Sequence, residues 1–400
     1  MFSDVSARGT VVGTLESIGG VIFMRKMLAL ALAAVLVVAG TAFAADDVIK
    51  VGIFNCLTGQ NAFGGQLELE GTQLAHSLMP EILGKKVELV VVDNKSDKVE
   101  AANAVTRLIE NDKVNVIIGT YGSSLAMAGG EVAEQAGIPV IGTSCTNPLV
   151  TLGKKYYFRA CFIDPFQGAG AATYAFKNLG LKKAATLIDV ANDYSVGLGT
   201  FFRNAYKKMG GEIVAELKYQ SGDQDFTAQL TELISKKPDI VFLPAYFAEG
   251  AIVLKQAKEL GAEFRFIGAD AMDNPEIVTL GGDAVEGFMH TTFAYDPSMK
   301  EMNPVAAKFT EEWKKVHPDK DPNVNSALGY DCYVMVADAI TRAGSAEPAK
   351  IRDALEATKD LPTVTGVTTI NATHDAEKEM GIVEIRNGKK TFLGLVKPEV

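Results

Sequence analysis

Reactive side chains are scarce in this sequence. Its 400 residues include only four cysteines and four histidines, and no C-x-x-C or H-x-x-x-H pair offers metal-ligand spacing. No G-x-G-x-x-G follows the first apolar run of the mature chain, and neither a G-x-S-x-G elbow nor a P-loop occurs. We therefore expect no metal, no cofactor and no catalysis. A secreted α/β enzyme is kept as an alternative. A histidine within hydrogen-bonding reach of Ser123 would support it.

Positive charge is not in excess either. The formal net charge is −10, and acids and bases are interspersed, whereas nucleic acids select basic faces. The composition therefore argues against a nucleic-acid partner. With 48% hydrophobic and 22% charged residues over this length, we expect an ordinary globular protein of two domains.

Long apolar runs are confined to the N-terminus. A basic segment at 24–26 precedes an apolar run at 27–38, and Ala42-Phe43-Ala44 ends it with small residues. This order is typical of a secretory signal peptide cleaved after Ala44. The alternative is a membrane anchor, although the run is shorter than the ~20 residues that span a bilayer. We expect residues 1–23 to be a mis-assigned start, Met24 to be the initiator, and the mature chain from Ala45 to be exported and soluble.

The four cysteines leave the redox state open. Export permits disulfides, and four cysteines allow three pairings. A bond between Cys145 and Cys161 is favoured because each follows or ends a neighbouring strand, but four buried thiols are an equal alternative; the other two cysteines are Cys56 and Cys332.

Short apolar runs alternate with helical periodicity along the mature chain. The first half predicts strands at 48–54, 87–92, 116–118, 138–141 and 156–162, with helices at 67–83, 99–109 and 123–136. The pattern restarts after Asp164-Pro165, with strands at 184–189, 213–219, 240–243, 265–268 and the start of 284–293, and helices at 166–179, 196–209, 226–234 and 248–260. This order implies parallel sheets with right-handed crossovers.

The last hundred residues are too few for a third lobe. We expect helices at 304–316, 326–343 and 351–357 and strands at 365–370, 381–385 and 391–396, with a hairpin turn at Asn387-Gly388. The fold class is therefore α/β: two Rossmann-like lobes, each a parallel sheet flanked by helices, joined by a multi-strand hinge. The N-terminal lobe is placed at 45–163 plus 292–380, and the C-terminal lobe at 164–291 plus 381–400.

Two hydroxyl-rich turns follow neighbouring strands of the first lobe. Ser123 is expected at the N-cap of the helix through Ala136, where free N–H groups bind anions. Thr146 lies in the second turn, 142–148. Since parallel strands present ligand sites at their carboxyl ends, the two turns predict a cradle for a small anionic or zwitterionic molecule. The alternative for Ser123 is a helix cap without a ligand.

The second lobe offers one carboxylate in a matching place. Asp270 follows a strand among apolar and small residues, where a carboxylate is costly to bury unless it is paired. A ligand ammonium would be a natural partner; the alternative is a cap for the segment after Met272. Tyr194 and Tyr246 also follow strands of this lobe and could close over a ligand.

The ordered set of turns resembles the leucine/isoleucine/valine-binding family of solute-binding proteins for ABC importers, which has the type I periplasmic binding protein fold. The resemblance covers nearly the whole mature chain and rests on G-T-Y-G-S-S at 119–124, T-N-P at 146–148, R-A-C-F-I-D-P-F-Q-G at 159–168, D-Y-S-V-G at 193–197 and G-G-D-A-V-E-G at 281–287.

The resemblance implies roles for individual residues. Ser123 and Thr146 would bind the ligand α-carboxylate, the Ser144 carbonyl would accept from the ammonium, and Asp270 would pair with the ammonium. The pocket walls would come from four aromatic residues: Phe63, Tyr121, Tyr194 and Tyr246. It further implies a periplasmic monomer that delivers an amino acid to a membrane permease as the lobes close.

The chain departs from the family pattern in three places. The acidic partner is Asp270 rather than glutamate, Ser96 and Gly122 stand where the family has a disulfide, and Asn325 stands near an aromatic wall position. Asn325 puts branched-chain selectivity in doubt and suggests a polar or larger amino acid. A second hypothesis keeps the fold but replaces the amino acid by an amide, urea, a nucleobase or an aromatic acid. An ion pair between Asp270 and a protein Lys or Arg would favour that second hypothesis.

Overall fold

The computed structural model describes Met1 and residues 48–299 and 301–398. The predicted signal peptide and its cleavage point lie outside these residues. From Ile49 onward the chain forms one compact unit. Within the described part, no helix has the length and apolar character needed to cross a membrane.

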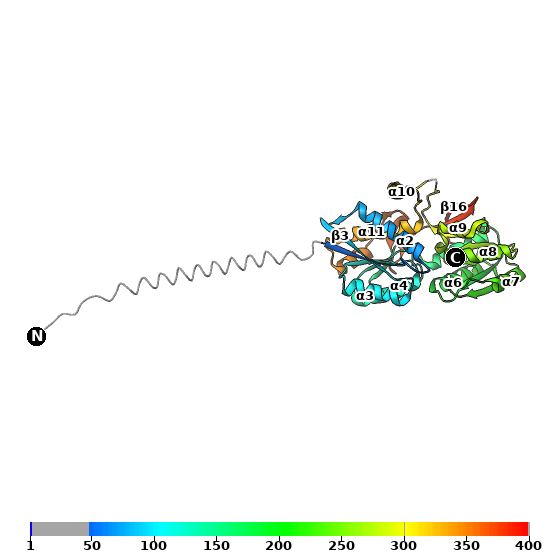
Figure 1. Ribbon diagram of the computed structural model, residues 1–400, viewed down its shortest axis with the longest axis horizontal. Coiled ribbons are helices and arrows are strands. Elements are labelled where there is room, and N and C mark those ends of the chain that lie inside the picture. The colour runs from blue at the N-terminus through cyan, green and yellow to red at the C-terminus, as the bar shows by residue number, and fades with distance from the viewer. Residues whose placement is uncertain (2–47, 300, 399–400) are drawn as a thin grey trace. The chain divides into compact units, whose positions relative to one another are not determined.

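The first sheet has six strands in the order β2-β3-β1-β4-β5-β6. Strands β1, β4, β5 and β6 pair in parallel, and β2 is antiparallel to β3. Helices α2 and α11 lie on one face, and α3 and α4 on the other (Figure 1). The bounds are β1 Val48–Asn55, α2 Ala62–Leu78, β2 Glu81–Ile82, β3 Lys85–Asp93, α3 Lys98–Glu110, β4 Val116–Ile118, α4 Ser123–Ala136, β5 Val140–Gly142 and β6 Tyr157–Arg159.

Alternation along β1 explains why helices cover both faces of this sheet. Side chains of a strand point to opposite faces in turn. Val51 and Ile53 pack in the same buried cluster as Leu328 of α11, whereas Phe54 packs with Val105 of α3. A strand that is apolar on both sides belongs in the middle of such a sheet.

The second sheet has seven strands in the order β16-β15-β11-β10-β9-β7-β8. Its five strands from β7 to β11 pair in parallel, and the β15–β16 hairpin is added antiparallel at the edge beside β11. The bounds are α5 Asp164–Thr173, β7 Lys183–Asp189, α6 Asp193–Lys208, β8 Glu212–Tyr219, α7 Thr227–Lys236, β9 Ile240–Leu243, α8 Phe247–Glu259, β10 Arg265–Gly268, α9 Glu276–Gly281 and β11 Met289–Phe293. The predicted α/β class is confirmed, with antiparallel strands added at the sheet edges.

The C-terminal hundred residues serve both sheets. Helices α10 Pro304–Val316, α11 Val324–Ala343 and α12 Pro348–Glu356 precede a small antiparallel sheet of β12 Leu361–Thr363, β13 Gly366–Ile370 and β14 Ala376–Glu377. The hairpin of β15 Met380–Arg386 and β16 Lys389–Val396 turns at Asn387-Gly388, as predicted.

The predicted helix 67–83 is shifted in the structure. Helix α2 begins at Ala62 and includes Gly64 and Gly65, which the sequence favours as a turn. A Cβ on Gly65 would lie 2.1 Å from the Cys56 carbonyl oxygen, so close packing against β1 requires glycine in this first turn. The helix ends at Leu78 because Pro80 follows, and a residue before proline avoids the helical region.

The predicted strand at the start of 284–293 is wrong. Residues Gly282–Val285 form a 3-10 turn, and β11 begins only at Met289. Gly282 and Gly287 both have positive φ, at 53° and 77°, and such residues turn the chain.

Candidate functional site

The first element of the site is the N-terminus of α4, directly after β4. Gly122, with φ 101°, is the capping residue, so the prediction that Ser123 is the N-cap is wrong. Ser123 is the first helical residue, and its Oγ accepts from the Asn147 N–H at 3.1 Å. Because this bond uses an oxygen lone pair, the hydroxyl hydrogen is available to an anion beside the unpaired first-turn N–H groups.

The second element is the turn after β5. Its Thr146 hydroxyl is buried and forms no well-aligned hydrogen bond, although it faces the Asp164 carboxyl group, while the Thr146 carbonyl accepts from the Asp164 N–H at 2.9 Å. Ser144 is also buried, and its hydroxyl donates to Glu68 Oε1. The Thr146 hydroxyl is thus free for a ligand, whereas the Ser144 side chain is already engaged.

A buried arginine fixes this turn from behind. Arg159 on β6 donates to the carbonyls of Cys145 and Asn147 at 2.6 and 2.9 Å. Its guanidinium also pairs with Asp375 at 2.7 Å, and both side chains are almost fully buried. The backbone of the turn is therefore held by charge-assisted hydrogen bonds.

Asp270 lies on the other side of the site, directly after β10. Its Oδ1 accepts from Gln167 Nε2 at 2.6 Å and from the Tyr194 hydroxyl at 2.8 Å. Burial raises the pKa of Asp270 to about 6, although these hydrogen bonds oppose the rise. Among the described residues, no Lys or Arg forms an ion pair with Asp270.

A second carboxylate lies close to Asp270. Asp164 opens α5, is fully buried, and neither of its oxygens has a well-formed hydrogen bond. Burial raises its pKa well above the usual range and the nearby Asp270 charge adds to the rise, although the Thr146 hydroxyl partly opposes it. The side-chain oxygen Oε1 of Gln167, one turn later, is also buried and has no hydrogen-bond partner.

Asp164 and Gln167 were not among the predicted ligand contacts. Both belong to the R-A-C-F-I-D-P-F-Q-G run at 159–168, which was used only as part of the family resemblance. The signal that could have found them is an acidic residue directly before Pro165 at a helix start, followed by an amide one turn later.

The rings of three predicted aromatic residues pack together close to Asp270. The ring centroid of Tyr246 lies 5.5 Å from that of Tyr121 and 5.6 Å from that of Tyr194. The Tyr121 hydroxyl donates to the Ala271 carbonyl at 3.3 Å, and the Ala271 N–H donates to the Tyr194 hydroxyl at 3.2 Å. The tyrosines thereby connect the two sheets around the carboxylate.

Phe63 and Asn325 lie at the margin of this set. The Phe63 ring packs edge-on against Phe247, with centroids 5.8 Å apart. The side-chain Nδ2 of Asn325 is buried without a hydrogen-bond partner, and within the described part no hydrogen bond joins Asn325 to the other predicted site residues. Its backbone N–H donates to Asn323 Oδ1 at the start of α11.

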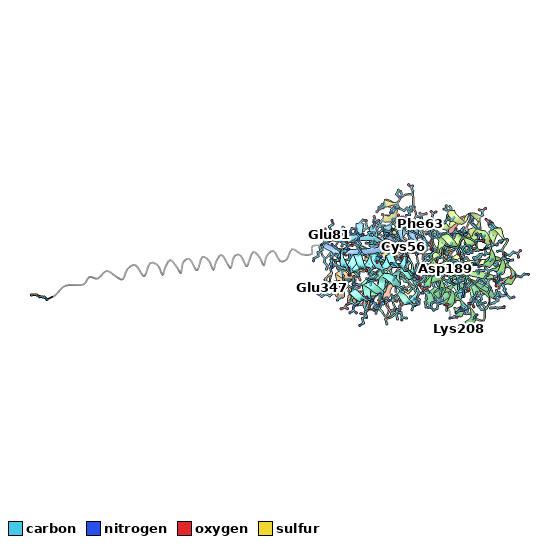
Figure 2. The ribbon with its side chains drawn as sticks, turned by 60° about the horizontal axis from the view of Figure 1, so that its bottom comes forward. Cys56, Phe63, Glu81, Asp189, Lys208 and Glu347 are labelled. Atoms are coloured by element: carbon cyan, nitrogen blue, oxygen red, sulfur yellow. The ribbon has the colours of Figure 1, made fainter. Side chains whose placement is uncertain are left out.

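Loops of the two sheets touch each other directly around the site. Ser124 donates to Asp193 Oδ2 at 2.8 Å, and Asn147 Nδ2 donates to the Asp193 carbonyl at 2.8 Å. Figure 2 shows Cys56, Phe63 and Asp189 in the middle of the described part, whereas Glu81, Lys208 and Glu347 lie at its periphery. The carboxyl ends of the strands thus face one another.

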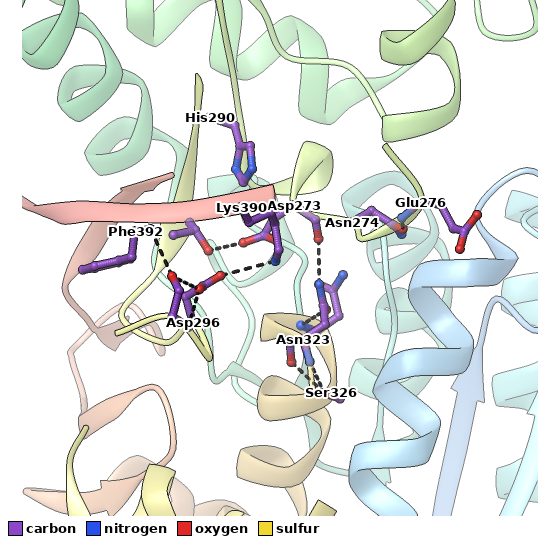
Figure 3. A network of polar contacts seen from close by, with 12 residues as sticks. Asp273, Asn274, Glu276, His290, Asp296, Asn323, Ser326, Lys390 and Phe392 are labelled. Carbon is purple, nitrogen blue, oxygen red and sulfur yellow. Dashed lines mark hydrogen bonds and ion pairs between the residues drawn. The ribbon is translucent and has the colours of Figure 1, made fainter. Parts of the chain in front are cut away.

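A separate polar network joins Asp273, three residues after Asp270, to the hairpin strand β16 (Figure 3). Lys390 pairs with Asp273 at 2.6 Å and Asp296 at 3.4 Å, while Asn323 donates to the Asp273 carbonyl at 3.0 Å. Burial by itself would raise the pKa of Asp273, but Lys390 holds it below its usual value. This network joins the segment after β10 to the cap of α11.

The favoured disulfide between Cys145 and Cys161 is not formed. All four cysteines are buried free thiols, which was the alternative. Burial raises the pKa of Cys161 well above its usual value and that of Cys56 to about 12. Such thiols are unreactive because the thiolate is the nucleophile.

The alternative of an α/β enzyme finds no support near Ser123. In the part of the chain that the structure describes, no histidine hydrogen-bonds to Ser123, and no three His, Cys, Asp or Glu side chains could hold a metal ion. Hydroxyls and first-turn amides lie on one side, and on the other lies the Asp270 carboxylate, which no described Lys or Arg pairs with; such a set suits a small zwitterionic solute.

Comparison with known proteins places this geometry in a family. A profile described as periplasmic binding protein matches residues 48–390. The crystal structure of a leucine-binding protein from Thermotoga maritima is 40% identical and covers 88% of this chain and 99% of its own, with a TM-score of 0.85. The chain therefore belongs to the periplasmic binding protein family, has its type I fold, and is a solute-binding protein of ABC transport rather than an enzyme.

Other relatives differ in what they bind. A leucine-, isoleucine-, valine-, threonine- and alanine-binding protein of Pseudomonas aeruginosa is 29% identical over 325 residues, which is 80% of this chain and 85% of the relative. A solute-binding protein of an ABC transporter from Rhodopseudomonas palustris, in complex with 3,4-dihydroxybenzoic acid, is 26% identical. It covers 89% of this chain and 99% of its own, with a TM-score of 0.79.

Proposed function

We propose that this protein binds an amino acid between the facing loops of its two sheets and delivers it to a membrane permease of an ABC importer. The observation that carries the proposal is Asp270, a buried carboxylate opposite Ser123 and Thr146 that forms no ion pair with any described Lys or Arg. An α-amino acid supplies an ammonium for Asp270 and a carboxylate for the hydroxyls and amides. Both charges would then be paired inside the protein, as buried charges require.

The proposal includes where the protein acts. The chain would act as a periplasmic monomer after cleavage at Ala44, and the lobes 45–163 plus 292–380 and 164–291 plus 381–400 would close on the ligand as in other hinged binding proteins. The contacts of Asp193 with Ser124 and Asn147 would belong to the closed form.

Calorimetric titration of the twenty amino acids and benzoate tests the proposal. We expect at least one amino acid to bind and Asp270→Asn to weaken its binding by roughly a hundredfold, since truncating one partner of a buried charge pair costs ~2–5 kcal/mol. The matched control is Asp283→Asn, an exposed carboxylate, which should bind as the wild type does.

The pH dependence of the same titration has a definite sign. Asp270 must be ionised to pair with an ammonium, and its pKa is about 6 without ligand. Protonation of Asp270 should therefore weaken binding as the pH drops below about 6. Binding of no amino acid at any pH would refute the proposal.

A second candidate is an aromatic acid. The three tyrosines around Asp270 and the likeness to a dihydroxybenzoate-bound protein favour it. Such a ligand lacks an ammonium and would leave Asp270 unpaired, so Asp270→Asn would then preserve or improve binding. Native mass spectrometry of the purified protein would identify a retained ligand of either kind.

A further inference from the structure

Three side-chain donors converge on a carboxylate that lies behind the ligand-binding turn. Glu68 on α2 is fully buried. Its Oε2 accepts from Asn55 Nδ2 at 2.8 Å and from Thr143 Oγ1 at 2.6 Å, and its Oε1 accepts from Ser144 Oγ. Thr143 and Ser144 begin the turn that carries Thr146, so Glu68 fixes the start of that turn.

The packing of α2 on α11 holds Glu68 in this place. A Cβ on Gly329 would lie 1.9 Å from the Glu68 carbonyl oxygen, and one on Gly71 would lie 1.8 Å from that of Ser326. Thr72 donates to the carbonyls of both Glu68 and Gly329, at 2.9 and 3.0 Å. The helices are thus in backbone contact, and the Glu68 backbone has little freedom to retreat.

The same network reaches the other ligand-binding element. Asn55, which donates to Glu68, accepts through Oδ1 from the Tyr121 N–H and the Thr120 hydroxyl, each at 3.0 Å. Tyr121 precedes the first turn of α4 and Ser123. One carboxylate and one amide therefore set the relative position of both elements that would hold the ligand carboxylate.

No cation offsets the charge of Glu68 within the described residues. The titratable groups that face it are Cys56, Tyr121 and Cys332, and burial raises the pKa of each thiol and phenol so that all three stay neutral. Burial also raises the pKa of Glu68 to about 7, with the hydrogen bonds from Ser144, Thr143 and Asn55 opposing the rise. A proton on one oxygen would remove an acceptor from one of the three donors.

We propose that Glu68 is a positioning residue for ligand binding: its ionised carboxylate holds the turn that carries Thr146 in the conformation that receives the ligand. This inference rests on the proposed function, because it deepens the account of the same site. Glu68 does not touch the ligand. It acts through Thr143 and Ser144 on the turn and through Asn55 on the start of α4.

The test compares Glu68→Gln with Glu70→Gln. Glu70 lies on the same helix and pairs with Lys320 away from the turn. Calorimetric titration with L-leucine should show Glu68→Gln binding roughly tenfold more weakly than wild type at pH 8, the scale of one lost hydrogen bond to a charged group. That ratio should approach one below pH 6, where wild-type Glu68 is protonated, and Glu70→Gln should match wild type throughout.

Taking the ratio to wild type at each pH removes the contribution of Asp270, which titrates in both proteins. A ratio that does not change with pH would overturn the proposal. Thr143→Val provides a second variant if Glu68→Gln does not fold. Loss of this donor should raise the pKa of Glu68 and move the midpoint of the pH profile upward, and an unchanged midpoint would contradict the assignment.

A ligand-free measurement separates failure of this inference from failure of the proposed function. If L-leucine does not bind wild type, amide hydrogen exchange of residues 143–147 still reports the turn. Glu68→Gln should then exchange faster than wild type at pH 8, with the excess vanishing below pH 6, while Glu70→Gln stays unchanged. Equal exchange in all three proteins would overturn the role of Glu68 whatever the ligand is.

Discussion

The turn after β5 and the start of α5 meet at Thr146 and Asp164, yet their polar groups are partnered very differently. Around the turn, Arg159 and Glu68 each hold several donors or acceptors at hydrogen-bonding distance. At the start of α5, Asp164 has no well-formed side-chain hydrogen bond, although it is equally buried. The turn is therefore preorganised, whereas the α5 side holds a buried carboxyl group without a well-formed partner, which a ligand could supply.

The largest change in stability should come from the turn after β5, whose polar groups are well partnered. Arg159→Met removes the cation that pairs with the buried Asp375 carboxylate. It also removes the donor to the carbonyls of Cys145 and Asn147. Breaking a buried ion pair from one side costs ~3–5 kcal/mol, and urea unfolding of the ligand-free protein would measure this loss.

An exposed pair gives the matched control for Arg159. Arg203 pairs with Glu216 at 2.9 Å, and both side chains are partly exposed. Arg203→Met should change stability by less than about 1 kcal/mol, as surface ion pairs do. Equal losses in the two variants would contradict the view that the turn is held by Arg159.

A substitution at Asp164, at the start of α5, should change stability in the opposite direction. Because burial raises the pKa of Asp164 in the folded protein, the folded state binds more protons than the unfolded state above pH 4. Its contribution to stability is present at low pH and is lost as the pH rises toward the folded pKa. Asp164→Asn should therefore stabilise the ligand-free protein at pH 8, because the amide keeps the shape of the carboxyl group without its titration.

Urea unfolding between pH 5 and pH 8 checks this prediction. The gain of Asp164→Asn over wild type should grow with pH, and the exposed control Asp283→Asn should show no such trend. A variant that is less stable than wild type at pH 8 would mean that Asp164 has a partner in solution.

Sequence periodicity predicted most of the fold because the informative signals are local. Strand β9, strand β10 and helix α10 begin and end where the apolar runs and breakers indicate. The start of α2 was missed because its two glycines are required by close packing, of Gly64 against the Tyr121 ring and of Gly65 against the Cys56 backbone, which no local pattern records. The edge position of the β15–β16 hairpin likewise depends on pairing with β11.

The residues of the candidate site also divide into those that local sequence patterns predict and those that they miss. Ser123, Thr146 and Asp270 could be proposed because parallel strands bring their carboxyl ends together. Glu68, Asp164 and Gln167 lie within helices, and only tertiary packing brings their polar ends to the strand termini. The binding roles of all these residues stay predictions until ligand binding is measured.

The smallest effect on ligand affinity should come from an exposed ion pair at the edge of the site, which joins a helix beside the first sheet to a helix beside the second. Lys98 at the start of α3 lies 3.3 Å from Asp193, and these side chains are 55% and 48% exposed. Since such pairs contribute little in water, Lys98→Met should change L-leucine affinity by less than about twofold at physiological salt. The control is Lys95→Met, which breaks an exposed pair with Glu100 on the first sheet alone. A loss above fivefold for Lys98→Met only would show that closure depends on rim charge rather than on the buried groups, and would reverse the comparison drawn between the two sides.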